Sequence, residues 1–391
     1  MKLLVVGFPY VRERYFVTWR HVPEPEHFRF LLPSRWTAKQ GRVVFTSPED
    51  PRIRTTRTFF HDSHAPLIGG LLKGWMPAFP WHLWRMRRSV RLVYACSEPT
   101  LLTTLYFAFF SKLFGKKFVC FTWENSPYEK KLRGLSYAIH YALLTINLAL
   151  ADGLICGNPE GLEIHRKYMD KPIAVIPMNG LDPEFFSLLQ TTNYKLQTFA
   201  GKELDGKIIF TFIGAIGYRK GIHLAIRALP EVLKKVPNAH LVIAGNGEYE
   251  EELDRQLETT NYKLPITRIP WLDDQGVRAL LSRTQVFLYP SIPHGGWAEQ
   301  FGYSMAEASL MEVPVIATRS GSIPYVVKDG ETGILVEPND ASSLADAMVR
   351  LGTDEALRRR LGEQGREYIS EQFSHKAIAK RFFHFFELIN D

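Results

Sequence analysis

The chain has 391 residues, of which 46% are hydrophobic and 23% are charged, as is ordinary for a soluble globular protein of two domains. No uninterrupted apolar run reaches the ~18 residues that a membrane-spanning helix requires, so we expect no segment to cross a bilayer. The net charge of +7 is uneven, because residues 1–185 carry 25 Lys and Arg against 15 Asp and Glu. This basic half predicts an anionic partner, most simply a membrane surface or an acidic acceptor.

Three cysteines, Cys96, Cys120 and Cys156, each lie at or near the end of an apolar run. An odd number of widely spaced cysteines argues against a disulfide framework or a zinc site and favours small buried hydrophobic residues. Residues 1–7 are too short for the apolar region of a signal peptide and are expected to form a first buried strand. We therefore expect a cytoplasmic protein that contacts a membrane at most peripherally, on its cytoplasmic face.

Short apolar runs alternate with helical stretches over residues 1–180. Strands are expected at residues 2–6, 43–46, 91–96, 117–122, 153–156 and 173–176, and helices at 100–114, 134–149 and 159–168. Strands separated by helices predict a parallel, doubly wound sheet, with function in the loops at the carboxyl ends of the strands. These loops are residues 7–10, 97–99, 123–127 and 157–159.

Aromatic and basic side chains are interleaved around residues 77–91. The large apolar residues are Trp75, Phe79, Trp81, Trp84 and Met86, and the basic ones are Lys73, Arg85, Arg87, Arg88 and Arg91. Such a mixture suits the headgroup region of a membrane. It would also stack on bases, but no nucleic-acid-binding signature accompanies it. A surface helix that packs its aromatic residues inward explains the pattern equally well.

Two groups of polar residues in this half are site candidates. Glu124 and Asn125 follow an expected strand and lie in a carboxyl-end loop, where polar residues either contact ligands or form turns. His61 and His64 are one helical turn apart but lack a third ligand, so we expect surface histidines rather than a metal site.

A glycine loop marks the start of the second half. Residues 183–205 lack periodicity, and an expected strand at 208–213 leads through a loop at 214–221 into a helix at 222–235. This geometry suits a pyrophosphate, although the spacing is neither that of a P-loop nor G-x-G-x-x-G. Lys220 would oppose the helix dipole without an anion nearby, which favours a role in anion binding.

Residues 289–338 hold the most informative stretch of the chain. At its centre, residues 299–307 read EQFGYSMAE, with Glu299 in a loop after an expected strand and Glu307 inside an expected helix. Gly302 lets the backbone approach an anion, so the amides at the helix start can hold a phosphate. The two carboxylates would repel a phosphate and fit sugar hydroxyls better. Taken alone, two glutamates at this spacing are explained as one loop residue and one solvated helix residue.

The ordered set of motifs resembles the donor-binding signature of the GT4-like, group 1 retaining glycosyltransferases of the GT-B fold. The family's E-x7-E motif is followed by an apolar strand, a G-G-x-P-E turn and a T-G-x-L-V segment, which read here VPVIAT, GSIPY and TGILV. Lys220 matches the lysine of the family's G-R-x-x-x-x-K-G segment. Tyr325 stands where the family has Glu, and Ala215 where it has Arg, with Arg219 as the nearest compensating cation.

The resemblance implies two Rossmann-like, doubly wound domains that face each other across a cleft. We expect an N-terminal acceptor-binding domain at residues 1–182, a linker at 183–206 and a C-terminal nucleotide-sugar-binding domain at 207–370. Residues 371–391 resemble the last helix of GT-B proteins, which crosses back to the first domain.

The resemblance also implies roles for individual residues. Lys220 is expected to stabilise the leaving diphosphate and Glu299 to hold the donor sugar. Glu124 is expected to replace the loop histidine that contacts the sugar in the family. The residues expected to bind the donor are Gly217, Arg219, Lys220, Trp271, Leu272, Phe301, Gly302, Tyr303, Ser304 and Glu307, with Trp271 and Leu272 near the base and Glu307 on the ribose.

The predicted function is transfer of a sugar, with retention, from a nucleotide-diphosphate sugar to a hydroxyl of a glycan or lipid-linked acceptor. No cofactor and no metal are expected, because the family lacks a D-x-D metal motif and so does this sequence. Two alternatives stay open: a sugar-nucleotide epimerase of the same fold, and an inactive sugar-binding or partner-binding module, which the departures at Ala215 and Tyr325 would suit.

Overall fold

The computed structural model describes residues 2–37, 44–61, 68–187, 204–259 and 264–391. Contacts divide the chain into two compact units, which are described separately. Unit 1 comprises Met1–Gly180 and His375–Asp391, and unit 2 comprises Leu181–Ser374. Most of the expected linker, residues 188–203, lies outside the described residues, as does His64.

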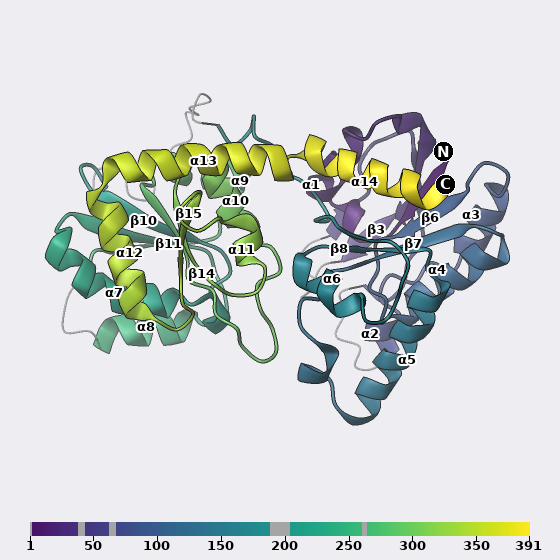
Figure 1. Cartoon of the computed structure of the whole chain (residues 1–391), viewed down its shortest axis with the longest axis horizontal. Coiled ribbons are helices and arrows are strands. Elements are labelled where there is room, and N and C mark those ends of the chain that lie inside the picture. The colour runs from purple at the N-terminus through teal and green to yellow at the C-terminus, as the bar shows by residue number, and fades with distance from the viewer. Residues whose placement is uncertain (1, 38–43, 62–67, 188–203, 260–263) are drawn as a thin grey trace. The chain divides into compact units, whose positions relative to one another are not determined.

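A parallel sheet forms the centre of unit 1 (Figure 1). In the part of unit 1 that the structure describes, its seven strands lie in the order β5-β2-β1-β6-β7-β8-β9. Their bounds are β1 Leu3–Val6, β2 Phe28–Pro33, β5 Ile53–Thr56, β6 Leu92–Ala95, β7 Lys117–Thr122, β8 Gly153–Cys156 and β9 Ile173–Val175. Strands such as β1 and β6 are buried at every position, as expected where helices cover both faces of a sheet. The predicted parallel, doubly wound sheet is confirmed.

Four strands of unit 1 differ from the sequence-based expectation. β2 and β5 were not predicted, and they extend the sheet beyond β1. The run at residues 43–46 was wrongly placed among the parallel strands. There, β4 (Val44–Thr46) pairs antiparallel with β3 (Arg35–Thr37) in a separate two-stranded sheet, and its side chains are exposed or half-buried. Such a surface hairpin needs no apolar cover on both faces.

Helices cover the unit 1 sheet, and the last one comes from the far end of the chain. The bounds are α1 Glu13–Phe16, α2 Ile68–Leu71, α3 Phe79–Arg85, α4 Leu102–Leu113, α5 Gly134–Leu150, α6 Pro159–His165 and α14 His375–Asn390. Phe382 of α14 packs against Trp19, with ring centroids 4.9 Å apart. Gly153 leaves room for this helix, since a Cβ there would lie 2.6 Å from Ile389.

Unit 2 also has a parallel sheet at its centre. Over the residues described, its strand order is β12-β11-β10-β13-β14-β15. The strands are β10 Ile208–Ile213, β11 Ala239–Ala244, β12 Ile266–Ile269, β13 Val286–Tyr289, β14 Val315–Thr318 and β15 Gly333–Val336. The helices are α7 Ile222–Lys235, α8 Glu250–Thr259, α9 Asp274–Leu281, α10 Tyr303–Leu310, α11 Ile323–Val326, α12 Ala341–Thr353 and α13 Glu355–Phe373.

Strand order locates the place in each sheet where ligands are expected. In a doubly wound sheet, the loops that follow the two strands on either side of the order reversal leave a crevice between them. The reversal lies between β1 and β6 in unit 1 and between β10 and β13 in unit 2. The loops after these four strands are therefore the first to consider.

Candidate functional site

In unit 2, the loops after β10 and β13 are in direct contact. The first loop ends in a short 3-10 helix, Tyr218–Lys220, followed by Gly221 in the left-handed region at φ +69°. A Cβ at Gly221 would lie 1.8 Å from the carbonyl oxygen of Pro290, so only glycine permits this approach. The amide of Ile292 donates a hydrogen bond of 2.8 Å to the carbonyl of Arg219. These contacts place Lys220 beside the second loop.

Lys220 forms a buried ion pair with Glu299 at this junction. Its Nζ lies 2.5 Å from Oε2 of Glu299 and donates a second hydrogen bond, of 2.7 Å, to the hydroxyl of Tyr289. The Tyr289 hydroxyl in turn donates to Glu299 at 2.8 Å. Only 12% of the Lys220 side chain and 10% of the Glu299 side chain are exposed. The structure thus joins two residues that the sequence had assigned to separate motifs.

Opposing effects act on the ionisation of this pair. Burial disfavours the charged carboxylate of Glu299, but the positive charge of Lys220 and the hydrogen bonds from Lys220 and Tyr289 together hold the pKa of Glu299 below its ordinary value. Burial also lowers the pKa of Lys220, and the charge of Glu299 partly offsets this effect. The resulting ammonium lies in a poorly solvated place, where an added anion interacts with it strongly.

The second loop continues into helix α10, and five of the predicted donor-binding residues lie at the end of this loop or in the helix. Gly302 caps the helix at φ +82°, and Tyr303 and Ser304 occupy its half-buried first turn. Phe301 is buried and packs its ring 4.6 Å from that of Tyr303, so it supports the turn rather than lining open space. Glu307, one turn further along, is only 5% exposed.

The remaining predicted donor residues lie around the same loops. Gly217 is buried, and a Cβ there would approach Oε1 of Glu248 to 3.0 Å. The side chain of Arg219 is exposed. Trp271 follows β12 and is 67% exposed, so the alternative that it packs in the core is wrong. Leu272 is half-buried against the start of α9.

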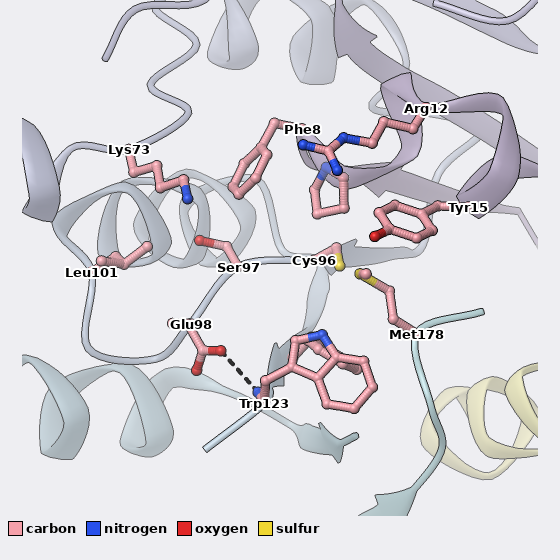
Figure 2. A pocket seen from close by; sticks show the side chains of 12 residues that line it. Phe8, Arg12, Tyr15, Lys73, Cys96, Ser97, Glu98, Leu101, Trp123 and Met178 are labelled. Atoms are coloured by element: carbon pink, nitrogen blue, oxygen red, sulfur yellow. Dashed lines mark hydrogen bonds between the residues drawn. The ribbon is translucent and has the colours of Figure 1, made fainter. Parts of the chain in front are cut away.

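A cavity of about 300 Å³ lies at the order reversal of the unit 1 sheet (Figure 2). Its lining residues come mainly from the loops after β1, β6 and β7 and are Phe8, Pro9, Arg12, Tyr15, Lys73, Cys96, Ser97, Glu98, Leu101, Phe121, Trp123 and Met178. In Figure 2, Arg12, Phe8 and Lys73 lie on one side of the cavity, and Glu98 and Trp123 on the other.

Glu98 is the functional candidate that sequence reasoning missed. Its carboxylate accepts a hydrogen bond of 2.8 Å from the amide of Trp123. Burial raises the pKa of Glu98 from 4.5 to about 7, against the lowering effect of its hydrogen bonds from Thr122 and Trp123. The sequence did mark residues 97–99 as a carboxyl-end loop, but nothing in the sequence distinguished Glu98 from a turn former.

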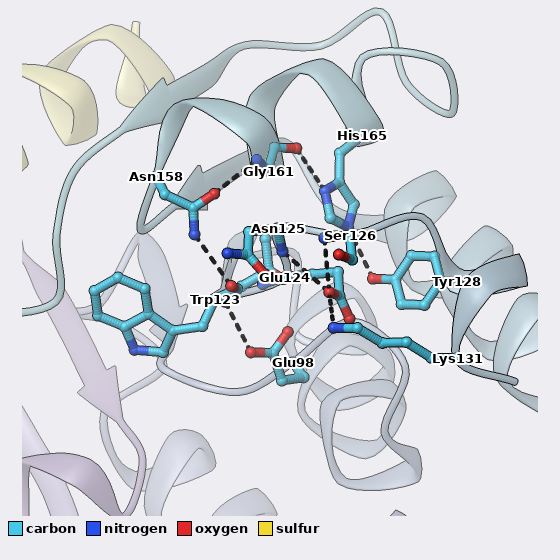
Figure 3. A network of polar contacts seen from close by, with 11 residues as sticks. Glu98, Trp123, Glu124, Asn125, Ser126, Tyr128, Lys131, Asn158, Gly161 and His165 are labelled. Atoms are coloured by element: carbon cyan, nitrogen blue, oxygen red, sulfur yellow. Dashed lines mark hydrogen bonds and ion pairs between the residues drawn. The ribbon is translucent and has the colours of Figure 1, made fainter. Parts of the chain in front are cut away.

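Glu124 belongs to a different polar network, shown in Figure 3. Its carboxylate pairs with the ammonium of Lys131 and accepts hydrogen bonds of 3.0 Å from the amides of Asn125 and Ser126. Next to it, the Tyr128 hydroxyl lies 2.9 Å from Nε2 of His165. Glu124 is not among the residues that line the cavity. These contacts fix the shape of the loop after β7, which carries Trp123.

Two further expectations for unit 1 are corrected by the structure. His61 is half-buried rather than on the open surface, because it accepts a hydrogen bond from the amide of Thr37 and stacks on Trp36. Around α3, the aromatic residues do not all pack inward. Phe79 is buried, but Trp81 and Trp84 are 52% and 49% exposed.

The described residues contain neither a candidate membrane span nor a candidate metal cluster. No helix there combines the length and apolar character needed to cross a bilayer. In the same part of the chain, no three His, Cys, Asp or Glu side chains are grouped so as to hold a metal ion.

Comparison with known proteins shows which family unit 2 resembles. Residues 195–368 match the family described as Glycosyl transferases group 1. This match lies within unit 2. The capsular polysaccharide biosynthesis glycosyltransferase CapM of Staphylococcus aureus is 32% identical over 211 residues, which make up 54% of this chain and 53% of CapM. The chain spans about half the length of the curated relatives it matches.

Solved structures resemble this chain over its whole length. Sucrose-phosphate synthase from Thermosynechococcus elongatus superposes with a TM-score of 0.74 at 19% identity and covers 100% of this chain and 99% of its own. Anabaena HepE, solved in complex with UDP, gives a TM-score of 0.72 at 16% identity, with 99% and 100% of the two chains covered. The chain therefore has the GT-B fold, and the predicted fold class is confirmed, as is the predicted resemblance to the group 1 glycosyltransferases over residues 195–368.

Proposed function

We propose that this protein is a retaining glycosyltransferase that moves a sugar from a nucleotide-diphosphate sugar to a hydroxyl of a glycan or a lipid-linked acceptor, without a metal or a cofactor. The observation that supports it most directly is the buried Lys220–Glu299 pair, held where two glycine-bearing loops meet at the order reversal of the unit 2 sheet. The names of the relatives and the UDP bound to Anabaena HepE support the same reaction class.

The donor is assigned to unit 2. Lys220 and the amides at Gly217 and at the start of α10 are suited to a diphosphate, because a buried cation and a helix N-terminus both stabilise negative charge. As the bond to the sugar breaks, charge grows on the leaving diphosphate, so these groups stabilise the transition state more than the ground state. Glu299 is proposed to accept hydrogen bonds from the donor sugar.

Glu307 and the loop after β12 are assigned to the nucleoside. Glu307, buried inside α10, is proposed to bind the ribose hydroxyls, as a carboxylate accepts two such bonds. Trp271, with its exposed ring, and Leu272 are proposed to contact the base. Arg219, exposed beside Lys220, adds positive charge near the diphosphate.

Retention is proposed to arise because the acceptor hydroxyl attacks the sugar from the same face from which the diphosphate departs. Lys220 and Tyr289 both donate hydrogen bonds to Glu299, and Lys220 also donates to Tyr289, so the three side chains hold one another in place. The leaving phosphate itself is then the base that accepts the acceptor proton, held on the correct face by Lys220.

The acceptor is assigned to unit 1, and a membrane contact is proposed on the same unit. Trp81 and Trp84 on α3 are half-exposed, and the guanidinium groups of Arg85 and Arg87 lie 4.8 Å and 4.4 Å from their ring centroids. Aromatic rings next to cations suit the headgroup region of an anionic bilayer. Helices α4 and α5 add the exposed apolar residues Phe109, Leu113, Leu135, Ile139 and Ile146.

A donor screen tests the proposed function. The purified protein is heated with a panel of nucleotide sugars, and the one that raises the melting temperature is then assayed for hydrolysis and for transfer. Lys220→Ala is expected to abolish both reactions. Lys234→Ala, which removes an exposed lysine of α7, is the matched control and is expected to keep them. Failure of every nucleotide sugar to bind, or full activity of Lys220→Ala, would contradict the proposal.

A further inference from the structure

The volume and the lining of the unit 1 cavity, together with its position, indicate what kind of ligand it binds. It opens where the loops after β1 and β6 diverge, which is the ligand-binding place of a doubly wound sheet. At about 300 Å³ it lies at the lower end of the range for small-molecule sites. A volume of this size accommodates one sugar ring with a substituent rather than an extended chain.

One wall of the cavity is cationic. Within the described ranges, no carboxylate lies within ion-pair distance of Arg12, whose guanidinium instead lies 4.5 Å from the ring centroid of Phe45 and 5.7 Å from that of Tyr15. Lys73 reaches the same wall, with Nζ 4.7 Å from the ring centroid of Phe8. Aromatic rings orient the guanidinium of Arg12 but do not neutralise it. A ligand anion would therefore gain charge-assisted hydrogen bonds from this wall.

The opposite wall suits a neutral, hydroxylated group. Glu98 presents a buried carboxyl group that is partly protonated near neutral pH. It can therefore accept hydrogen bonds from hydroxyl groups and donate a hydrogen bond to one. The indole of Trp123 lies beside it (Figure 2). Gly157 makes room for this ring, because a Cβ at Gly157 would lie 2.2 Å from the indole.

Aromatic surfaces complete the cavity between the two walls. Phe8 is stacked on Trp36 at a centroid distance of 4.2 Å and an interplanar angle of 11°, which fixes the ring that faces the cavity. Phe121 packs edge-on against Trp123 at 5.4 Å and holds the second ring. Rigid aromatic faces of this kind pack against the apolar C–H faces of a sugar.

From these features we infer that the unit 1 cavity binds an acceptor sugar that carries an anionic substituent, with Arg12 and Lys73 on the anion, Glu98 on the ring hydroxyls and Phe8 and Trp123 against the ring. This inference rests on the proposed function, because it identifies the acceptor of that reaction. A carboxylate of a uronic acid and a phosphate ester share the required charge.

The test titrates the full chain with three probes by calorimetry: methyl glucoside, methyl glucuronide and the 6-phosphate of methyl glucoside. At least one anionic probe is expected to bind tenfold or more tightly than the neutral glycoside, and comparing the two distinguishes a carboxylate site from a phosphate site. Arg12→Gln is expected to remove this preference, and Lys73→Met to weaken it. Equal affinities for all three probes, no binding of any of them, or an unchanged preference in Arg12→Gln would overturn the inference.

Two controls keep the outcomes separate. Lys220→Ala, in unit 2, is expected to bind the anionic glycoside as the wild type does, which excludes binding of the probe at the donor site. Arg12→Gln is expected to keep its melting temperature and its thermal shift with the nucleotide sugar. A chain that binds a nucleotide sugar but does not prefer the anionic glycosides contradicts only the acceptor inference. A chain that binds no nucleotide sugar contradicts the proposed function.

Discussion

Gly221 packs so closely on Pro290 that a Cβ at position 221 would lie 1.8 Å from the Pro290 carbonyl oxygen. The contact joins the loop that carries Lys220 to the loop that carries Glu299. Backbone contact at this point is what allows the two side chains to meet, because any side chain at position 221 would push the loops apart.

Gly221→Ala is therefore expected to damage both stability and donor binding. The left-handed conformation alone costs an L-residue about 1 kcal/mol. The clash with a backbone oxygen adds to it, so we expect a total loss of about 3 kcal/mol or more in the free energy of unfolding, measured by urea denaturation. Gly115→Ala is the matched control, because Gly115 has a similar φ of +66° but open space around it. Equal losses in the two variants would contradict this account of the contact.

Glu299→Gln is expected to leave the buried ammonium of Lys220 without its counter-charge. Breaking a buried pair from one side typically costs about 3 kcal/mol or more, whereas replacing both partners by uncharged groups costs less. The double variant Lys220→Met/Glu299→Gln should therefore be more stable than Glu299→Gln and yet fail to bind a nucleotide sugar. Thermal denaturation and thermal shift measure the two properties. If the double variant were no more stable than Glu299→Gln, Glu299 would not be the counter-charge that stabilises the buried ammonium of Lys220.

The same pair predicts a dependence of stability on pH. Because the folded pKa of Glu299 is lowered, the folded state binds its proton more weakly than the unfolded chain does. The stability that Glu299 contributes to the folded state is thus present at a pH above its ordinary pKa, and it is lost as the pH falls through the pKa of the folded state. Urea denaturation between pH 3 and pH 7 should show a steeper loss toward acid for the wild type than for the double variant.

Glu98 is expected to show the opposite dependence on pH. Its folded pKa of about 7 lies above the ordinary 4.5, so the folded state binds this proton more tightly than the unfolded chain. Stability due to this group is complete below about pH 4.5 and falls as the pH rises to about 7, by up to about 3 kcal/mol. Glu98→Gln removes this loss, and its stability relative to the wild type should rise between pH 5 and pH 8. An unchanged difference between the two proteins over this range would argue against a buried, titrating carboxyl group.

Trp81 and Trp84 predict binding to anionic membranes. The double variant Trp81→Ala/Trp84→Ala is expected to lose at least tenfold in affinity for vesicles of phosphatidylglycerol and phosphatidylcholine, measured by co-sedimentation. Both rings are already half-exposed, so stability should change little. Leu388→Ala, which shortens an exposed apolar residue of α14, is the control and should bind as the wild type does. Equal binding of wild type and double variant would exclude α3 as the contact.

Much of unit 2 could be predicted from its sequence because its signals are local. Strand β10, the glycine loop and helix α7 follow one another along the chain, and so do β13, Gly302 and α10. The residues of each motif therefore predict its strand, loop and helix without reference to distant parts of the chain. Unit 1 gave weaker signals. Strands β2 and β5 were missed, since β2 ends in proline and β5, at the edge of the sheet, has a single buried position. Glu98 was missed because only burial distinguishes it from other loop carboxylates.

The sequence by itself determined the parallel α/β class of this protein, its group 1 glycosyltransferase motifs and the uneven charge of its two halves, all of which depend on residue type and spacing along the chain. Tertiary structure alone decided that Lys220 pairs with Glu299, that Arg12 and Glu98 face one cavity and that Glu124 is held by Lys131. These relationships join residues whose separation in space depends on strand order and on close backbone contacts such as that at Gly221, which residue spacing does not encode.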